Sequence, residues 1–453
     1  MKKKTKDSLP DRGQIVMICA IVLCALTAFV FNRPAGTQGA QSAPAPAVTP
    51  MPDSDGLRIA VASDLHFDPE NADKSRKHSE IVYNPELIDA LLRDAKKQGA
   101  EILLLTGDLV NGGRPGRHEA LAAKLKRAEE SGLTVYVLPG NHDLAPVTQT
   151  QFAAYYADFG FSEAYSRDPV SLSYCALRED LGLMILMMDT AGYSVGAIDL
   201  PGAKGIENDE AFLSADTLRW AERMLRTARE KGLRVLCAGH YNLLPEISRE
   251  HLSGFYLENA QYFASLLREY GVPLYLSGHM HLRMVYRENG LTELLTEFLL
   301  AYPTGYSMLD LTDAGITCTP RRVDVDDWAA ETGQTDPVLL GFSAWQQEEL
   351  LNYSRENVGY MTERNPLKPR ETDQAVRFFY AVMDAYWAGT LSERRAEIRA
   401  MPGYEPFFRS AEGYAYAWWL KDLIDTVPPE LAGFTLEWPE AAPTGGEPPD
   451  YAA

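Results

Sequence analysis

The sequence predicts an α/β protein in which two mixed β-sheets form a sandwich flanked by helices, followed by a small C-terminal helical bundle. Two observations predict this architecture. Apolar runs of strand length alternate with helix-like segments from residue 57 to about residue 325, and helix-like segments alone follow after about residue 336. Alternation of this kind is typical of layered α/β domains, whereas helices without strands form bundles.

The first strands are predicted from five apolar runs, each of which is followed by a polar motif. The runs are Leu57–Ala62, Ile102–Leu105, Val135–Leu138, Val235–Ala238 and Leu274–Leu276. Their length and apolar character predict buried strands. Helices between them are expected to begin at Asn84-Pro85 and Ser214 and to end at Gly132 and Gly232, because such residues cap helices.

The sequence at the end of the α/β domain predicts antiparallel strands, in contrast to the alternating strands and helices before it. Leu291–Leu295, Ser307–Leu311 and Ile316–Val323 follow one another without an intervening helix, so we expect them to add antiparallel strands. Beyond them, helices are predicted over residues 343–353, 372–387, 392–401 and 411–425. Their aromatic side chains are expected to form the core of the bundle and its contact with the first domain.

An uncharged apolar run follows a basic segment at the N-terminus. The run, Ile15–Phe31, is about 17 residues long, which is short for a membrane-spanning helix and long for the core of a cleaved signal peptide. The small-residue sequence Ala45-Pro46-Ala47 lies too far downstream to be its cleavage site. We therefore expect a single-pass anchor in the cell membrane, with the basic end inside and the remaining chain extracytoplasmic. A secreted protein with a removed signal is the alternative.

These patterns divide the chain into six predicted parts. They are a cytoplasmic N-terminus (1–14), a transmembrane anchor or signal segment (15–31), a flexible linker (32–56), the α/β domain (57–325), a helical domain (336–435) and a disordered tail (436–453). The linker is rich in proline, alanine and glycine, which suits an extended tether.

Charge and cysteine content restrict the partners and the covalent links. A formal net charge of −20 repels polyanions and argues against a nucleic-acid duplex, but not against a small anion held by metal. The five cysteines show no zinc-type pairing. A disulfide between Cys175 and Cys318 and the oligomeric state both stay open.

Five polar motifs follow the predicted strands in a fixed order. They are Asp64-Leu65-His66, Gly107-Asp108, Gly140-Asn141-His142-Asp143, Gly239-His240 and Gly278-His279-Met280-His281. Because ligands bind beyond the carboxyl ends of strands in open α/β sheets, we expect these motifs to meet at one rim. Carboxylate, imidazole and amide groups without a thiolate suit hard or borderline divalent cations.

The order of the motifs resembles that of the calcineurin-like metallophosphoesterase family. The family pattern D-x-H, G-D, G-N-H-[DE], G-H and G-H-x-H is complete within residues 57 to 325, and it implies the αββα sandwich of that family. The segment Gly239–Leu244 and the C-terminal helical domain are most similar to the class III cyclic-nucleotide phosphodiesterase branch and its exported bacterial members. Purple acid phosphatases, a related group, carry a tyrosine where this chain has Asn111, so that group is excluded.

The resemblance implies a centre of two divalent metal ions. The first ion would be bound by Asp64, His66, Asp108 and His281, and the second by Asp108, Asn141, His240 and His279. A shared carboxylate can bridge two cations about 3.5–4 Å apart, and water between them becomes a hydroxide nucleophile near neutral pH. Oxygen and nitrogen ligands accept Mn, Fe, Zn or similar ions, so the identity of the metals stays open.

Residues beside the ligands are the candidates for catalysis and substrate binding. The resemblance implies that His142 contacts the phosphate or protonates the leaving oxygen, and imidazole suits this role because its pKa lies near the operating pH. Asp143 could orient that imidazole. The candidate substrate-binding residues are Asn141, His142 and His251.

The remaining histidines and one aspartate lie outside the motifs. His78, His118 and His251 lie in polar surroundings and are expected at the surface, with a place in the pocket as the alternative for His251. Asp189 follows an apolar run, and it is expected either to support a metal ligand or to occupy a turn.

The predicted function is hydrolysis of a small phosphodiester, such as a cyclic nucleotide, by a dinuclear metallophosphoesterase. An outward-facing domain gives envelope phosphodiesters and extracellular nucleotides equal standing as substrates. A phosphomonoesterase acting on a nucleotide or envelope phosphate ester is one alternative, although a dianionic phosphate needs extra cationic or donor groups. A catalytically silent binding scaffold is the alternative of another class, and the complete ligand set argues against it.

Overall fold

The computed structural model describes residues 56–71, 80–144, 146–191, 211–244, 256–426 and 433–439. The predicted membrane segment, residues 15–31, lies outside these ranges, as do His78 and His251. Within the described part, no helix combines the length and the apolar character needed to cross a membrane.

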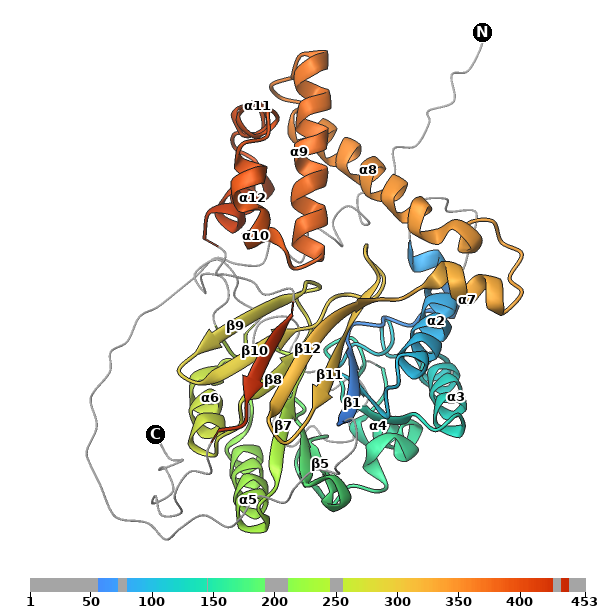
Figure 1. Ribbon diagram of the computed structural model, residues 1–453, viewed down its shortest axis with the longest axis vertical. Coiled ribbons are helices and arrows are strands. Elements are labelled where there is room, and N and C mark those ends of the chain that lie inside the picture. Colours follow the sequence, from blue (N-terminus) through green and yellow to red (C-terminus); the bar gives the residue numbers. More distant parts are fainter. Residues whose placement is uncertain are drawn as a thin grey trace, which may run out of the picture.

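Two mixed sheets form the centre of the molecule (Figure 1). The first contains six strands, in the order β13 (Phe434–Glu437), β12 (Gly315–Arg322), β11 (Gly305–Leu311), β1 (Leu57–Ala62), β2 (Ile102–Leu105) and β3 (Thr134–Val137). Strands β1, β2 and β3 are parallel, and β11, β12 and β13 continue the sheet in antiparallel pairs. Two of the three predicted antiparallel additions, Ser307–Leu311 and Ile316–Val323, are therefore present in this sheet. The third, Leu291–Leu295, lies in the second sheet, where it has one parallel and one antiparallel neighbour.

The second sheet contains seven strands. Their order is β4 (Ser166–Arg167), β5 (Tyr174–Arg178), β6 (Leu183–Met187), β7 (Arg234–Ala238), β8 (Leu274–Ser277), β10 (Leu291–Leu295) and β9 (Met284–Glu288). The four central strands β6, β7, β8 and β10 are parallel. Their side chains are buried almost throughout, as expected for parallel strands covered on both faces.

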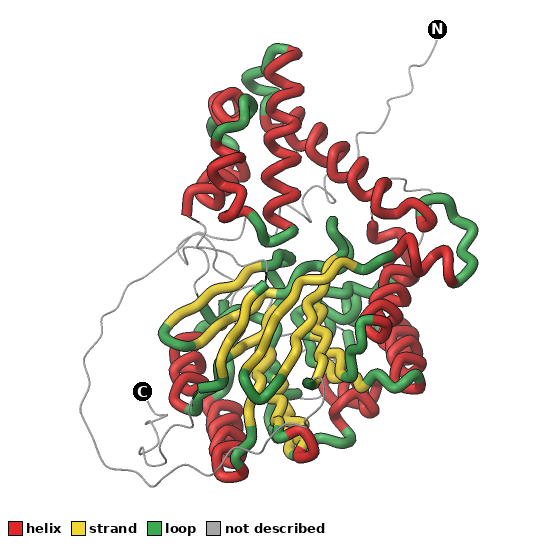
Figure 2. Tube along the Cα trace, viewed as in Figure 1, coloured by secondary structure: helices red, strands yellow, loops and turns green. Residues whose placement is uncertain are grey.

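Helices cover the outer sides of this sandwich (Figures 1 and 2). Beside the first sheet lie α2 (Asn84–Lys97), α3 (Pro115–Glu130), α4 (Gln149–Tyr155) and α7 (Val325–Glu331), and beside the second lie α5 (Ala215–Lys231) and α6 (Ala260–Glu269). The predicted start of α5 is confirmed, because the Ser214 side chain accepts a hydrogen bond from the N–H of Thr217. Short helical turns occupy Pro69–Asn71, Glu80–Tyr83, Ala157–Phe161, Glu179–Leu181 and Leu339–Gly341.

The C-terminal helical region lies at one end of the sandwich (Figure 1). It comprises α8 (Phe342–Met361), α9 (Pro369–Trp387), α10 (Leu391–Arg399), α11 (Tyr404–Ser410) and α12 (Ala415–Thr426). Its apolar side chains form one buried cluster with Met280, Leu282 and Tyr302 of the sandwich. The helical region therefore packs directly against the Gly278–His281 loop. The predicted two-sheet sandwich with a helical C-terminal region is confirmed.

Residues 433–439 include the first residues of the predicted disordered tail, and they lie on the sandwich. There β13 pairs with β12, and the indole of Trp438 donates a hydrogen bond to the carbonyl of Thr312 at 2.8 Å. The rest of the predicted tail, residues 440–453, lies outside the described part of the chain. Composition alone could not indicate this strand, because a four-residue strand is stabilised by its pairing partner rather than by its own sequence.

The three cysteines in the described part of the chain form no disulfide. Cys175 lies in β5 of the second sheet and Cys318 in β12 of the first. Both are buried free thiols, as is Cys237 in β7, so no disulfide links Cys175 to Cys318.

Candidate metal centre

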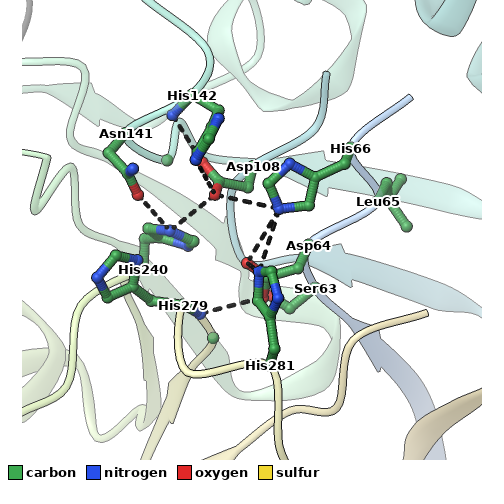
Figure 3. Close-up of polar contacts among 12 residues, drawn as sticks. Ser63, Asp64, Leu65, His66, Asp108, Asn141, His142, His240, His279 and His281 are labelled. Carbon is green, nitrogen blue, oxygen red and sulfur yellow. Dashed lines mark hydrogen bonds and ion pairs between the residues drawn. The ribbon is translucent and has the colours of Figure 1, made fainter. Parts of the chain in front are cut away.

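The five polar motifs meet at the carboxyl ends of parallel strands from both sheets (Figure 3). Strands β1, β2 and β3 supply the first three motifs, and β7 and β8 supply the last two. Backbone bonds join neighbouring loops, such as the N–H of Asp64 to the carbonyl of Gly107 and the N–H of Gly278 to the carbonyl of His240. The rim predicted from the strand pattern thus includes residues from both halves of the sandwich.

Four side chains form the first potential ligand group. They are Asp64, His66, Asp108 and His281, and each offers one ligand atom within 4.8 Å of the others. The Nε2 atom of His66 lies 3.4 Å from Asp108 Oδ2 and 3.2 Å from His281 Nε2. The Nε2 atom of His281 lies 3.3 Å from Asp64 Oδ1. These are the residues predicted for the first metal.

The second potential ligand group shares Asp108 with the first. Ligand atoms of Asp108, His240 and His279 also lie within 4.8 Å of one another. The Nε2 atom of His240 lies 3.5 Å from Asp108 Oδ2 and 3.1 Å from the amide oxygen of Asn141. The structure therefore brings all four residues predicted for the second metal to one place.

The distances and the free lone pairs of both groups fit divalent cations. Ligand atoms around a four- or six-coordinate ion with bonds of about 2.1 Å lie roughly 3.0–3.5 Å apart, which matches the spacing found here. Asp64 Oδ1 is buried, and among the described residues it accepts no hydrogen bond. A buried carboxylate oxygen without a donor is unfavourable unless a cation satisfies it.

Several of the potential metal ligands have an unusual backbone conformation. Asp64, His66, Asp108, His279 and His281 all adopt positive φ angles, between 40° and 70°. In the described part of the chain, only Asn289 and Thr304 share this conformation among residues other than glycine. Left-handed backbone costs free energy in such residues and persists where the surrounding structure imposes it, commonly at functional sites.

Two of the motif glycines leave room for the ligand carboxylates. A Cβ atom at Gly140 would overlap Asp108 Oδ1, and one at Gly278 would overlap Ser63 Oγ and approach Asp64 Oδ2 to 2.6 Å. The glycines are therefore required by close approach of the backbone to ligand side chains.

The hydrogen bonds of His240 set its tautomer. Its Nδ1 atom lies 2.9 Å from the carbonyl oxygen of Thr106, which can only accept, so Nδ1 carries the hydrogen. In the neutral imidazole the Nε2 lone pair is consequently directed at Asp108 and Asn141, where a metal can bind it. Thr190 supports the same loop, because its Oγ1 accepts the backbone N–H groups of His240 and Tyr241, each at 3.0 Å.

Burial and neighbouring charge act in opposite directions on the pKa values of this centre. Burial raises the pKa of Asp64, but the imidazoles of His281 and His66 outweigh it and hold that pKa well below the usual range. Burial likewise lowers the pKa of His240, but the charge of Asp108 raises it to about 9. The metal-free centre thus keeps the Asp64 carboxylate ionised, which is the state that binds cations, whereas a metal ion must displace the Nε2 proton of His240.

His142 lies beside Asp108 and His66 in the centre (Figure 3). Its side chain is 45% exposed, and its ring contacts the His66 ring edge to face at 4.8 Å. Its Nε2 atom lies 3.9 Å from Asp108 Oδ2, and its backbone N–H donates to Asp108 Oδ1 at 2.8 Å. The charge of Asp108 raises the pKa of His142, but burial and the neighbouring histidines outweigh it and lower that pKa.

Asp143 has partners other than the predicted imidazole of His142. Its carboxylate accepts backbone N–H groups of Leu109, Val110 and Gly140 at 3.1, 2.9 and 2.8 Å. Among the described residues, no hydrogen bond joins this carboxylate to the His142 ring. Asp143 instead ties the loop of Asp108 to the loop of Asn141.

The surface location predicted for His118 is wrong. The residue is 0% exposed, its Nε2–H donates to the carbonyl oxygen of Asp143 at 3.0 Å, and its Nδ1 accepts from the hydroxyl of Tyr156 at 2.9 Å. Its spacing from Leu121 and Leu125, at i+3 and i+7 of the same helix, is the signal that places it on the buried face.

Two aromatic residues that the motif analysis missed contact the ligands. Phe298 stacks on the ring of His281 at 4.2 Å and meets the ring of His66 at 5.6 Å. Tyr241 packs on the ring of His279 at 4.2 Å. Asp189 occupies a turn, because its carboxylate accepts the N–H groups of Leu172 and Ala191.

The chain is similar to proteins of known families. Residues 57–283 match the calcineurin-like phosphoesterase family, and residues 324–425 match the C-terminal domain of cyclic nucleotide phosphodiesterase. No curated protein matches the chain significantly.

Solved structures with similar folds are distant in sequence. A dimetal phosphatase from Danio rerio is 12% identical and aligns over 59% of this chain and 97% of its own, with a TM-score of 0.44. The protein TT1561 of Thermus thermophilus is 15% identical over 59% and 99%, with a TM-score of 0.39. A putative 5'-nucleotidase from Staphylococcus aureus is 11% identical over 59% and 54%, with a TM-score of 0.39.

Proposed function

This chain belongs to the calcineurin-like phosphoesterase family, and from that premise we propose that it is a dinuclear metal-dependent phosphodiesterase acting on small phosphodiesters such as cyclic nucleotides. The single observation that carries the proposal is the shared Asp108, whose carboxylate belongs to both potential ligand groups. One carboxylate between two cation positions is the arrangement that two-metal phosphoester hydrolysis requires.

The two cations would be held by the two ligand groups described above, with Asp108 shared between them. When bound, such ions activate water as a nucleophile and neutralise charge on the phosphoryl oxygens. Manganese, iron and zinc all suit this mixture of carboxylate, amide and imidazole ligands.

The residues of the chain complete the chemistry around the metals. His142, half-exposed beside Asp108, is placed to donate a proton to the leaving oxygen of a substrate at the centre. Asn141 and His142 are the proposed phosphate contacts. His251, the third candidate, lies outside the described residues.

Two observations support a diester over a monoester. Among the described residues, the two buried arginines are already paired, Arg117 with Asp68 at 2.8 Å and Arg283 with Glu297 at 3.5 Å. A dianionic monoester benefits from additional cationic donors more than a monoanionic diester does. The similarity of residues 324–425 to the C-terminal domain of cyclic nucleotide phosphodiesterase points the same way.

We also propose a location for the enzyme at the cell membrane. The basic segment and the apolar run at residues 15–31 support an anchor in the cell membrane, with the catalytic domain outside the cytoplasm. Substrates would then be phosphodiesters of the envelope or of the medium.

A substrate panel on the manganese-loaded full-length protein tests the proposal. We expect hydrolysis of bis-p-nitrophenyl phosphate and of a cyclic nucleotide, with a higher kcat/KM than for p-nitrophenyl phosphate or a nucleoside monophosphate. A preference for the monoesters would favour a phosphomonoesterase, and two bound metals without any hydrolysis would favour a binding scaffold.

The variant His142→Ala tests the proton-donor role. We expect turnover to fall by about 10²–10⁴-fold, the usual contribution of general acid catalysis, while metal content stays at the wild-type level. Loss of metal from this variant would contradict the assignment.

A further inference from the structure

A buried carboxylate lies behind the loops that carry His240 and His279. Glu293 is the central residue of β10, its side chain is 0% exposed, and it belongs to neither potential ligand group. Strand β10 runs parallel to β8, and Glu293 lies opposite Tyr275 in their register. The carboxylate is therefore held by a strand interior and not by a loop.

The donors that meet this carboxylate come from the loop after β7 and from the end of β8, where the loop of His279 begins. The backbone N–H of Leu244 donates to Oε2 at 2.6 Å, and the N–H of Leu243 lies 3.1 Å from both oxygens. The hydroxyl of Ser277 donates to Oε1 at 2.7 Å.

Both loops carry a ligand of the second group. Leu243 and Leu244 follow His240 by three and four residues, and Ser277 precedes His279 by two. Asn242 adds a direct link between the loops, because its Nδ2 donates to Ser277 Oγ at 3.0 Å and to the carbonyl of Gly278 at 3.2 Å.

We propose that Glu293 is a positioning residue that sets the separation of the His240 and His279 loops, and thereby the affinity of the second metal position. The same role in the first sheet belongs to Asp143, which joins the loops of Asp108 and Asn141. Each sheet thus uses one buried carboxylate to align a pair of ligand loops. The inference rests on the dinuclear centre of the proposed function, but not on its substrate.

The effect of losing this carboxylate is selective. The first ligand group takes Asp64, His66 and Asp108 from loops of the first sheet. The hydrogen bonds described above join Glu293 instead to Leu243, Leu244 and Ser277 of the second sheet. Only His281 of that group shares a loop with His279. Glutamine at position 293 keeps the volume but turns an N–H₂ group toward N–H donors, so at least one donor loses its partner.

The test is calorimetric titration of the metal-free, full-length protein with Mn²⁺. In Glu293→Gln we expect one of the two Mn²⁺ affinities to fall by about 10- to 100-fold, the usual effect of losing a group that supports a metal ligand, while the other changes less. Hydrolysis should recover at high Mn²⁺ concentration. The matched control is Asp94→Asn, which alters a buried carboxylate that bonds Tyr306 at 2.8 Å, and it should bind Mn²⁺ like the wild type.

Ser277→Ala provides a second variant that removes one hydroxyl and no charge. We expect a change in the same direction but smaller than in Glu293→Gln, and this variant decides the outcome if Glu293→Gln does not fold. Wild-type affinity at both metal positions in the folded variants, or equal weakening of both positions, would overturn the proposal. Because Mn²⁺ binding is measured directly, a wild-type protein that binds two ions without hydrolysing any ester refutes the proposed function and leaves this inference standing.

Discussion

Because His118 is buried, we expect the free energy of unfolding to decrease measurably in mild acid. Its ring is enclosed by Phe152, Tyr155 and Tyr156, and burial lowers its pKa from the ordinary 6.5 to about 4. In the unfolded chain the imidazole binds a proton between these two values, whereas in the folded protein it stays neutral. The folded state is therefore favoured fully above pH 6.5, and that part of its stability is lost as the pH falls toward 4.

The magnitude follows from the size of the pKa difference. Each pKa unit corresponds to about 1.4 kcal/mol, so His118 should contribute about 3 kcal/mol of pH-dependent stability across this range. Such an amount is a large fraction of the roughly 5–15 kcal/mol typical of a folded protein.

The variant His118→Gln isolates this contribution. Glutamine does not titrate, and its amide can still donate to the carbonyl of Asp143. Urea denaturation, followed by circular dichroism with a chelator present, should be measured at several pH values between about 4 and 7.5. We expect the wild type to lose about 3 kcal/mol more than the variant over this range, because all other groups titrate alike in both. Parallel pH profiles would refute the reasoning.

Three further predictions concern the metal centre, and each is checked by Mn²⁺ titration and elemental analysis. Asp108→Asn removes the charge shared by both ligand groups, so Mn²⁺ binding should weaken by at least about 100-fold at both positions; retention of two tight sites would exclude Asp108 as the bridge. Gly140→Ala should lower metal content because its Cβ overlaps Asp108 Oδ1, whereas Gly359→Ala, with no atom within 4 Å of its Cβ, should not; equal content in both would contradict the steric argument. Phe298→Ala removes the ring stacked on His281, worth about 0.5–1.5 kcal/mol, and should weaken one Mn²⁺ position by about 2- to 12-fold; unchanged binding would mean that the ring does not hold His281.

Much of the fold could be predicted from the sequence because its signals are local. The segments that form β1, β2, β7 and β8 consist mainly of apolar residues, and this composition predicts that they are buried. Ser214 and Gly232 predict the two ends of α5, because serine caps the start of a helix and glycine its end. The strand β13 carried no such signal, because its stability comes from pairing with β12, more than a hundred residues earlier in the chain.

The candidate metal centre also has parts that the sequence predicts and parts that it does not. The metal ligands can be recognised in the sequence, because metal binding requires particular side chains and these occur beside glycine at the ends of predicted strands. The supporting roles of Asp143, Glu293 and His118 cannot be read from the sequence, because each depends in part on backbone groups, and backbone N–H and carbonyl groups are identical in nearly every residue.

The sequence by itself determined which side chains can bind metal, in what order they occur and on which strands. Only the tertiary structure decided that a carboxylate on β10 aligns two loops of the second sheet and that His118 lies buried behind Asp143. The physical reason is that ligand identity is a property of single residues, whereas the positioning of a ligand depends on hydrogen bonds between segments that only folding brings into contact.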